Sequence, residues 1–399
     1  MNDRFVFGLI EGFYGRMWSW DDRMDWCRFL GAQKADFYLY APKDDEHLRR
    51  RWLEPWDRAT RDRLEKLRGL CGDEGLLFGP GLSPYEIYLD WNADSRRRLE
   101  RRLADLKTLE PGILGVFFDD MKGDRSSMAR VQADVAHIAA DALPDARVVV
   151  CPTYYSDDPA LRMLFGDEPA GYLEGLGEAL DPSIDVFWTG PMVCSEGYPE
   201  EHLRRVAGRL GRRPFLWDNY PVNDGVRMAP FLHLRPPHGR PPRPAELCSG
   251  FAANPMNQPW LSRLPFAALG AQWASGETDP EALWARALGL VDDPALRALL
   301  DRDRDAFQDR GIGYAGTDRA FAEGWKKRIS ENPRFATLPE KDRAAIVREH
   351  SEFERKVANA LTDDERAAKR AEYAAIDHPA AREVAEWLDG LYRCHPESF

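Results

Sequence analysis

The sequence predicts an α/β protein, a (β/α)8 TIM barrel with an all-helical C-terminal domain. Over about the first 275 residues, eight short apolar runs alternate with longer amphipathic segments, which is the pattern of a parallel sheet covered by helices. Each run ends in polar or aromatic residues, as expected where barrel strands open onto one common face. Beyond residue 276 the apolar positions recur three and four residues apart, which is typical of helices.

The expected strands are the short runs that are rich in β-branched and aromatic residues. They are Phe5–Gly12, Asp36–Ala41, Leu76–Gly81, Ile113–Phe118, Ala146–Cys151, Ile184–Trp188, Pro214–Trp217 and Gly250–Ala253. Helical patterns between them include Arg58–Cys71, Ala93–Leu109 and Ala129–Ala142. An open doubly wound sheet is the alternative, and it is disfavoured because no G-x-G-x-x-G follows the first strand. The predicted domains are therefore a barrel over residues 1–276 and a helical domain over 277–399.

Composition and charge exclude several classes of protein. The net charge of −12 disfavours binding to nucleic acid or to anionic membranes. No stretch approaches the roughly 20 apolar residues of a membrane span, and the N-terminus lacks the pattern of a signal peptide. The six cysteines form no C-x-x-C pair, so neither a zinc site nor a dithiol motif is expected. Scattered thiols without a leader predict a reduced, cytoplasmic protein.

Patterns for other hydrolytic chemistries are missing from the sequence. Neither H-x-H nor H-E-x-x-H occurs, which disfavours a metal-dependent barrel hydrolase. No G-x-S-x-G elbow occurs either. We therefore expect no metal and no cofactor.

The fourth expected strand ends in two adjacent carboxylates, Asp119 and Asp120, in the stretch "GVFFDDM". One could simply cap the next helix while the other pairs with a basic residue. In a partly desolvated barrel mouth, however, the two should titrate as a coupled pair with one remaining protonated. Because successive strand side chains alternate in direction, the pair does not suit the ordinary arrangement of two acids flanking a scissile bond. It suits acetal hydrolysis in which one acid orients a nucleophile on the substrate and the other protonates the leaving group.

Aromatic and amide side chains near the other strand ends favour a sugar ligand. Flat aromatic rings pack against the C–H faces of pyranoses. Each of these rings could equally well pack inside the barrel. The rings are those of Phe13, Tyr14, Tyr154, Tyr155, Trp188, Trp217 and Tyr220. Short side chains suited to hydroxyl groups are Asn219, Asn223, Asp224, Asn254 and Asn257.

A family resemblance rests on motifs that occur in order along residues 5–275. They are "GLIEGFYGRMWSW", "YAPKDD", "FFDDM", "CPTYY", "FWTGP", "WDNYPVND" and "NPMNQ". Together they resemble the β-N-acetylglucosaminidases of glycoside hydrolase family 84, the O-GlcNAcases. The resemblance implies a barrel enzyme that removes N-acetylglucosamine with retention and without a metal.

The resemblance also implies the catalytic roles. Asp119 would bind the acetamido N–H and orient the group, whose carbonyl oxygen attacks the anomeric carbon to form an oxazoline. Asp120 would be the general acid and then the general base, and Tyr155 would hydrogen-bond to the reacting group. The rest of the acetamide pocket would be Cys151, Thr189 and Trp217.

Further residues are implied as substrate-binding. Asn219 would support the acetamido group. The backbone carbonyl of Gly12 and the side chain of Lys43 would contact sugar hydroxyls. Asp224 and Asn257 would hold the hydroxyls on the far side of the ring.

Two positions depart from the family pattern. Met17 stands where proline is expected, which affects only a turn. Tyr154 stands where glutamate is usual, which is expected to reshape the aglycone side.

Several questions stay open from the sequence. The substrate could be a GlcNAc-containing glycopeptide or a glycan, and the C-terminal helices are a candidate surface for a homodimer. A hyaluronidase-like enzyme, another hexosaminidase and a catalytically weak glycopeptide-binding barrel are the alternatives. The proline-rich segment Leu234–Pro244 is expected to be a solvated surface loop.

Overall fold

The computed structural model describes residues 4–123, 125–225, 227–312 and 317–391. By its packing the chain divides into two compact units. Unit 1 consists of Met1–Gly12, Ser19–Asn219 and Gly239–Asn254, and unit 2 of Phe13–Trp18, Tyr220–His238 and Pro255–Phe399. The domain boundary predicted at residue 276 stays a prediction.

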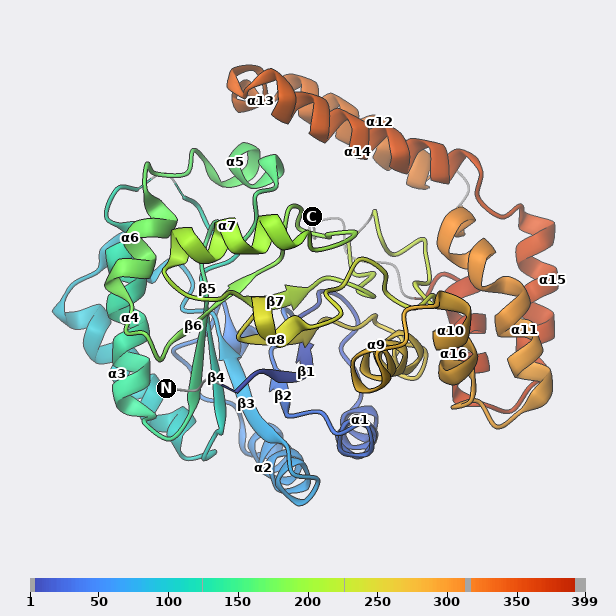
Figure 1. Ribbon diagram of the computed structural model, residues 1–399, viewed down its shortest axis with the longest axis horizontal. Coiled ribbons are helices and arrows are strands. Elements are labelled where there is room, and N and C mark those ends of the chain that lie inside the picture. Colours follow the sequence, from blue (N-terminus) through green and yellow to red (C-terminus); the bar gives the residue numbers. More distant parts are fainter. Residues whose placement is uncertain (1–3, 124, 226, 313–316, 392–399) are drawn as a thin grey trace. The chain divides into compact units, whose positions relative to one another are not determined.

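Unit 1 contains a closed barrel of eight parallel strands that pair in sequence order, with the last strand pairing with the first (Figure 1). The strands are β1 (Val6–Glu11), β2 (Phe37–Tyr40), β3 (Leu77–Leu82), β4 (Ile113–Phe117), β5 (Arg147–Cys151), β6 (Asp185–Trp188), β7 (Phe215–Asp218) and β8 (Gly250–Ala253). The predicted (β/α)8 TIM barrel is confirmed. Every predicted strand end lies within one residue of the observed end.

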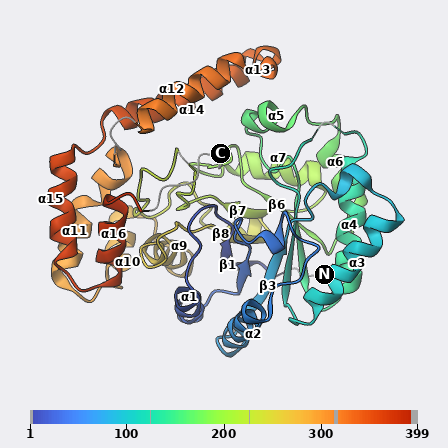
Figure 2. The same cartoon turned by 180° about the vertical axis from the view of Figure 1, so that it is seen from behind.

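The helices of unit 1 follow the strands and begin at capping residues. The side chains of Ser19, Asp57 and Asn92 accept hydrogen bonds from backbone N–H groups in the first turns of α1, α2 and α3. Figures 1 and 2 show α2, α3, α4 and α6 outside the strands. The helices are α1 (Trp20–Ala32), α2 (Arg58–Asp73), α3 (Ala93–Lys107), α4 (Met128–Ala142), α5 (Pro159–Phe165), α6 (Tyr172–Ala179), α7 (Glu200–Leu210) and α8 (Pro244–Leu247), with 3₁₀ turns η1 (Glu46–Leu48) and η2 (Ile87–Asp90).

Three aromatic rings fill the barrel interior near the ends of β4, β6 and β7. The ring centroid of Phe117 lies 6.0 Å from that of Phe187 and 5.3 Å from that of Trp217. Glycines leave room for the Phe117 ring, because a Cβ at Gly81 or Gly115 would lie 2.3 Å from its carbon atoms. We call these three rings the aromatic floor.

Unit 2 is helical, as the pattern beyond residue 276 predicts. Its helices are α9 (Arg263–Ser275), α10 (Pro280–Leu288), α11 (Pro294–Asp305), α12 (Thr317–Glu331), α13 (Pro333–Thr337), α14 (Glu340–Ala358), α15 (Asp363–Ala374) and α16 (Pro379–Leu388), with a π-helical turn η3 (Ala306–Arg310). Its core packs the large side chains Trp284, Phe307, Tyr373 and Trp387. In the described part of the chain, no helix is long and apolar enough to cross a membrane.

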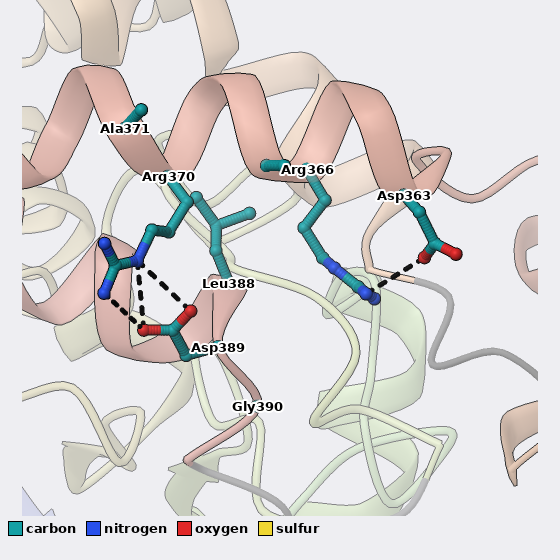
Figure 3. A pocket seen from close by; sticks show the side chains of 8 residues that line it. Asp363, Arg366, Arg370, Ala371, Leu388, Asp389 and Gly390 are labelled. Carbon is teal, nitrogen blue, oxygen red and sulfur yellow. Dashed lines mark hydrogen bonds and ion pairs between the residues drawn. The ribbon is translucent and has the colours of Figure 1, made fainter.

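A surface hollow of about 680 Å³ lies beside α15 and α16 of unit 2 (Figure 3). Two ion pairs line it, one joining Arg366 to Asp363 at 2.9 Å and one joining Arg370 to Asp389 at 3.1 Å. None of the predicted site residues lines this hollow.

The proline-rich segment Leu234–Pro244 is more buried than predicted. Leu234 is fully buried in the core of unit 2. In unit 1 the Arg240 guanidinium is buried and donates to both carboxylate oxygens of Asp218, at 2.9 and 2.7 Å. The prediction of a solvated loop is therefore wrong for these residues, because their apolar and positively charged groups are used inside the protein.

Two cysteines that lie far apart in the sequence meet between α1 and α2. The Sγ atoms of Cys27 and Cys71 are 2.7 Å apart, and both side chains are fully buried. Burial raises the pKa of the Cys71 thiol. No spacing motif could predict this contact, because it depends on how the two helices pack.

We predict that Gly115→Ala destabilises the barrel. The added Cβ would meet the buried Phe117 ring at 2.3 Å, and overpacking of this kind costs about 1–3 kcal/mol. The measurement is the free energy of unfolding in urea. The control is Gly69→Ala in α2, where nothing lies within 4 Å of the new Cβ, so the stability should be unchanged or rise by up to about 1 kcal/mol. Equal stabilities for the two variants would contradict the packing argument.

Candidate active site

The two adjacent carboxylates lie in a turn immediately after β4. The strand ends at Phe117, and Asp119 and Asp120 follow it in turn conformation. Asp120 has a φ of 54°, a left-handed conformation that Asp tolerates better than most residues at a cost of about 1–2 kcal/mol. Alternation along a strand therefore does not set the directions of the two side chains, and the sequence-based argument from alternation is wrong on this point.

Asp119 is buried and makes an ion pair with a lysine from another strand end. Its Oδ2 accepts a hydrogen bond from Nζ of Lys43, which follows β2, and both side chains are buried. Its Oδ1 is also buried and has no hydrogen-bond partner among the described residues. The negative charge that Asp119 places next to Asp120 is thus paired with the positive charge of Lys43.

The loop that carries Lys43 is held by a buried aspartate that the sequence prediction missed. The Tyr40 hydroxyl and the Trp56 Nε1 both donate to Oδ2 of Asp45, at 2.9 and 2.8 Å. Asp45 also caps the turn η1 through the N–H of His47. The only signal in the sequence was the acidic pair that follows Lys43 in "YAPKDD".

Asp120 is held by Tyr155 and Arg49, which come from other loops. The Tyr155 hydroxyl donates to Oδ1 of Asp120 at 3.2 Å. The guanidinium of Arg49 donates to the backbone carbonyl of Asp120 at 3.3 Å. Tyr155 was predicted as a site residue, and Arg49 was not, because no motif marks it.

The predicted acetamide-pocket residues Cys151, Thr189 and Trp217 are all buried. Burial raises the pKa of the Cys151 thiol well above its ordinary value, and the Asp119 carboxylate adds to the rise. A neutral thiol is a poor nucleophile, so Cys151 can line a pocket but is unsuited to covalent catalysis. Thr189 joins the site through its N–H, which donates to the Tyr155 carbonyl at 2.9 Å.

Trp217 is oriented by a chain of amide hydrogen bonds. Its Nε1 donates to Oδ1 of Asn219 at 3.0 Å, and Nδ2 of Asn254 donates to the same oxygen at 2.9 Å. Oδ1 of Asn254 in turn accepts from the N–H of Gly12 at 3.2 Å. A Cβ at Gly12 would lie 2.5 Å from the Trp217 ring, so glycine permits this close approach.

Asn219, which was expected to support the acetamido group, makes three hydrogen bonds to other residues that the structure describes. Nδ2 of Asn219 donates to the Val193 carbonyl at 2.9 Å, and its oxygen already accepts two hydrogen bonds. Asn254 was named from the sequence only as a hydroxyl-binding side chain, whereas the structure gives it a connecting position between β1 and β7.

The remaining predicted residues, Asp224 and Asn257, belong to unit 2. Both contact Tyr14 of the same unit: its N–H donates to Oδ2 of Asp224 at 2.9 Å, and its carbonyl accepts from Nδ2 of Asn257 at 3.1 Å. The N–H of Asn257 also donates to Oδ1 of Asn223 at 3.1 Å. The two predicted residues and Tyr14 thus form one hydrogen-bonded group.

The site in unit 1 combines the two carboxylates of Asp119 and Asp120 with the rings of the aromatic floor. Lys43 Nζ lies 5.3 Å from the ring centroid of Trp217 and 5.6 Å from that of Phe117, so the ion pair with Asp119 stands over the aromatic floor. Within the described ranges, no group of three His, Cys, Asp or Glu residues could hold a metal ion. Paired carboxylates at the strand ends of a barrel are what glycoside hydrolases use.

Comparison with known protein families also indicates a glycoside hydrolase. The profile of the beta-N-acetylglucosaminidase family matches residues 7–302, which is more than half of the chain. The chain belongs to this beta-N-acetylglucosaminidase family, glycoside hydrolase family 84, as the motifs predicted.

Individual relatives extend the comparison. The Protein O-GlcNAcases of Rattus norvegicus and Mus musculus are each 30% identical over 261 residues, which cover 63% of this chain and 28% of theirs. The chain thus matches little more than a quarter of the length of these relatives. A solved structure of an O-GlcNAc hydrolase mutant from Thermobaculum terrenum superposes with a TM-score of 0.73 at 27% identity, covering 98% of this chain and 82% of that one.

We predict strong energetic coupling between Lys43 and Asp119. Lys43→Met leaves a buried carboxylate without its counter-charge and should cost about 3–5 kcal/mol of unfolding free energy. Adding Asp119→Asn removes that charge and should recover most of the loss, which a double-mutant cycle in urea measures.

The control for this cycle is the exposed pair Arg96 and Glu100, whose N–O distance is 3.0 Å. Its coupling should be below about 1 kcal/mol because solvent screens it. Simple additivity of the Lys43 and Asp119 changes would show that the ion pair contributes nothing.

Proposed function

We propose that the chain is a retaining exo-β-N-acetylglucosaminidase that removes O-linked N-acetylglucosamine by substrate-assisted catalysis through an oxazoline. The observation that carries the proposal is the buried Oδ1 of Asp119, which has no partner among the described residues. A buried acceptor of this kind gains much from a donor. The acetamido N–H of the substrate supplies one.

In the proposed first step, Asp119 accepts the acetamido N–H and turns the group so that its carbonyl oxygen attacks the anomeric carbon. The bond from that carbon to the leaving oxygen breaks, and Asp120 gives its proton to the leaving oxygen. The acetamido nitrogen passes its proton to Asp119, which leaves a neutral oxazoline. Lys43 pairs with Oδ2 of Asp119, so Oδ1 is the oxygen proposed to accept the acetamido N–H. The Tyr155 hydroxyl is proposed to hydrogen-bond to the reacting group, and its contact with Asp120 at 3.2 Å supports this role.

In the proposed second step, Asp120 takes a proton from water while the water oxygen attacks the anomeric carbon. The bond between the anomeric carbon and the oxazoline oxygen breaks, Asp119 returns the proton to the nitrogen, and the acetamide is restored. Two successive displacements at one carbon give retention of configuration. The residue that acts as acid in the first step is the base in the second.

The acetamide methyl and carbonyl are proposed to lie among Cys151, Thr189 and Trp217. The neutral thiol of Cys151 and the rigidly held Trp217 ring support this assignment, since both are apolar surfaces for a methyl group. Asn219 can donate through its amide nitrogen, since its oxygen is occupied.

Contacts to the sugar hydroxyls are proposed for the Gly12 carbonyl and for Lys43. The assignment of Asp224 and Asn257 to sugar hydroxyls rests on their motifs alone.

The substrate is proposed to be a GlcNAc-containing glycopeptide or glycan. The rat and mouse relatives are named Protein O-GlcNAcase, which supports glycopeptides. A cytoplasmic location and a homodimer formed through the C-terminal helices stay predictions from the sequence.

We predict that the protein hydrolyses an aryl N-acetyl-β-glucosaminide and leaves the matching aryl β-glucoside almost untouched. The glucoside lacks the acetamide that acts as nucleophile, so the measurement is kcat/KM for the two substrates. Equal turnover of both would rule out substrate assistance. Binding of the glucosaminide without turnover would favour a glycan-binding barrel, and preference for longer chito-oligosaccharides would favour an endo-acting enzyme.

We predict that Asp120→Asn lowers kcat by about 10²–10⁴-fold with poor leaving groups, because general acid catalysis contributes about that much. Good leaving groups need little protonation, so kcat for substrates that carry them should fall much less. The comparison is a series of aryl glucosaminides of increasing phenol acidity. Asp119→Asn serves as the matched variant and should lower the rate for all leaving groups alike. If the Asp120→Asn variant kept full activity on substrates with poor leaving groups, Asp120 could not be the general acid.

A further inference from the structure

The residue before the two carboxylates is held on both sides of its backbone. Phe118 is fully buried and immediately precedes Asp119. Its N–H donates to the Cys151 carbonyl at 2.8 Å. Its carbonyl accepts from Oγ1 of Thr153, also at 2.8 Å. The segment after β5 therefore fixes the peptide from which the turn starts.

Behind Thr153 lies a closed ring of hydrogen bonds. Nε2 of Gln132 donates to Oγ1 of Thr153 at 2.9 Å, and the N–H of Thr153 donates to the Tyr172 hydroxyl at 3.0 Å. The Tyr172 hydroxyl closes the ring by donating to Oε1 of Gln132. We call Thr153, Gln132 and Tyr172 the Thr153 ring.

The ring fixes the direction of the Thr153 hydroxyl. A threonine hydroxyl has one hydrogen to give. Gln132 donates to its oxygen, so that hydrogen is committed to the Phe118 carbonyl. Burial raises the pKa of the Tyr172 phenol, which therefore keeps its proton and stays a donor.

Gln132 is a polar side chain on a buried helix face that is otherwise apolar. It is fully buried on α4, on a face that is otherwise formed by residues such as Val131, Val135, Ala136 and Ala139. An amide there costs free energy unless all its groups are bonded, whereas an apolar side chain would fill the space at no such cost. Tyr172 begins α6, and α4 and α6 lie side by side outside the barrel (Figures 1 and 2). The ring thus anchors the strand ends to two helices.

We propose that the Thr153 ring positions the Asp119–Asp120 turn through the backbone of Phe118. Thr153 is then a positioning residue, since it reaches the carboxylates only through another residue. The left-handed Asp120 needs neighbours that over-determine its conformation. Tyr155, two residues beyond Thr153, holds the Asp120 side chain, so one short segment holds the turn at both ends.

The activity test rests on the proposed function and compares Thr153→Val with Thr153→Ser. Valine keeps the shape and loses the hydroxyl, so kcat for aryl N-acetyl-β-glucosaminide should fall on the order of 10²-fold with little change in KM, because a misplacement of about 1 Å costs that much. Serine keeps the hydroxyl and should restore most of kcat. The control is Thr108→Val, whose hydroxyl donates to the Asp105 carbonyl at the end of α3, and its kcat should be unchanged.

A second variant tests whether the ring acts as one unit. Gln132→Met keeps the length of the side chain and frees the Thr153 hydroxyl to turn, so it should also lower kcat. Combined with Thr153→Val it should add little, because both changes break the same chain of bonds. Fully additive losses would count against a single positioning ring.

A purely stabilising role gives different results. In that case Thr153→Val would lower the melting temperature and leave kcat of the folded enzyme unchanged, which would overturn the proposal. If the wild-type protein does not hydrolyse the substrate, the proposed function fails, and crystal structures then decide the positioning role by themselves. The proposal requires a displaced Asp119–Asp120 turn in Thr153→Val and an unmoved one in Thr153→Ser. A turn that is unmoved in both variants overturns it.

Discussion

The burial of carboxylates at the barrel's strand ends is the constraint on which the arrangement of unit 1 depends. Glu11 at the end of β1 is fully buried, and both its oxygens are used by Arg23 and by the Tyr38 hydroxyl. Asp218 at the end of β7 is also fully buried, and both its oxygens accept from Arg240. A buried charge is tolerated only when it is paired and hydrogen-bonded, and these two carboxylates meet that condition completely.

Asp119 meets the same condition only in part. Lys43 pairs with one oxygen, and the other is buried without a partner among the described residues. A lysine supplies a single point charge, whereas the arginines at Glu11 and Asp218 bind with two nitrogens each. The choice of lysine therefore leaves an acceptor available above the aromatic floor. Glu11 and Asp218 thus have both oxygens hydrogen-bonded within the protein, whereas the carboxylate that we assign to the acetamide keeps one buried oxygen for the substrate.

The segment from Cys151 to Tyr155 connects this electrostatic constraint to the geometry of the turn. The Cys151 carbonyl and the Thr153 hydroxyl hold the backbone before Asp119, and Tyr155 holds the side chain of Asp120. The intervening Tyr154 points into the protein, where its hydroxyl donates to the Gly166 carbonyl at 2.8 Å and its ring packs against Tyr172. The departure from the family pattern at position 154 is thus a buried packing residue in this chain.

The sequence by itself determined the barrel, its strand ends and the place of the two adjacent carboxylates after the fourth strand, because strand length, apolar periodicity and ordered motifs are properties of short stretches. Only the tertiary structure decided that Lys43 faces Asp119 across 76 positions of sequence, that Asn254 joins Gly12 to Asn219, and that Arg240 of the proline-rich segment is buried. It also decided the left-handed turn at Asp120, which strand alternation predicted wrongly. These features depend on which strand ends the closed barrel brings together, and no local pattern carries that information.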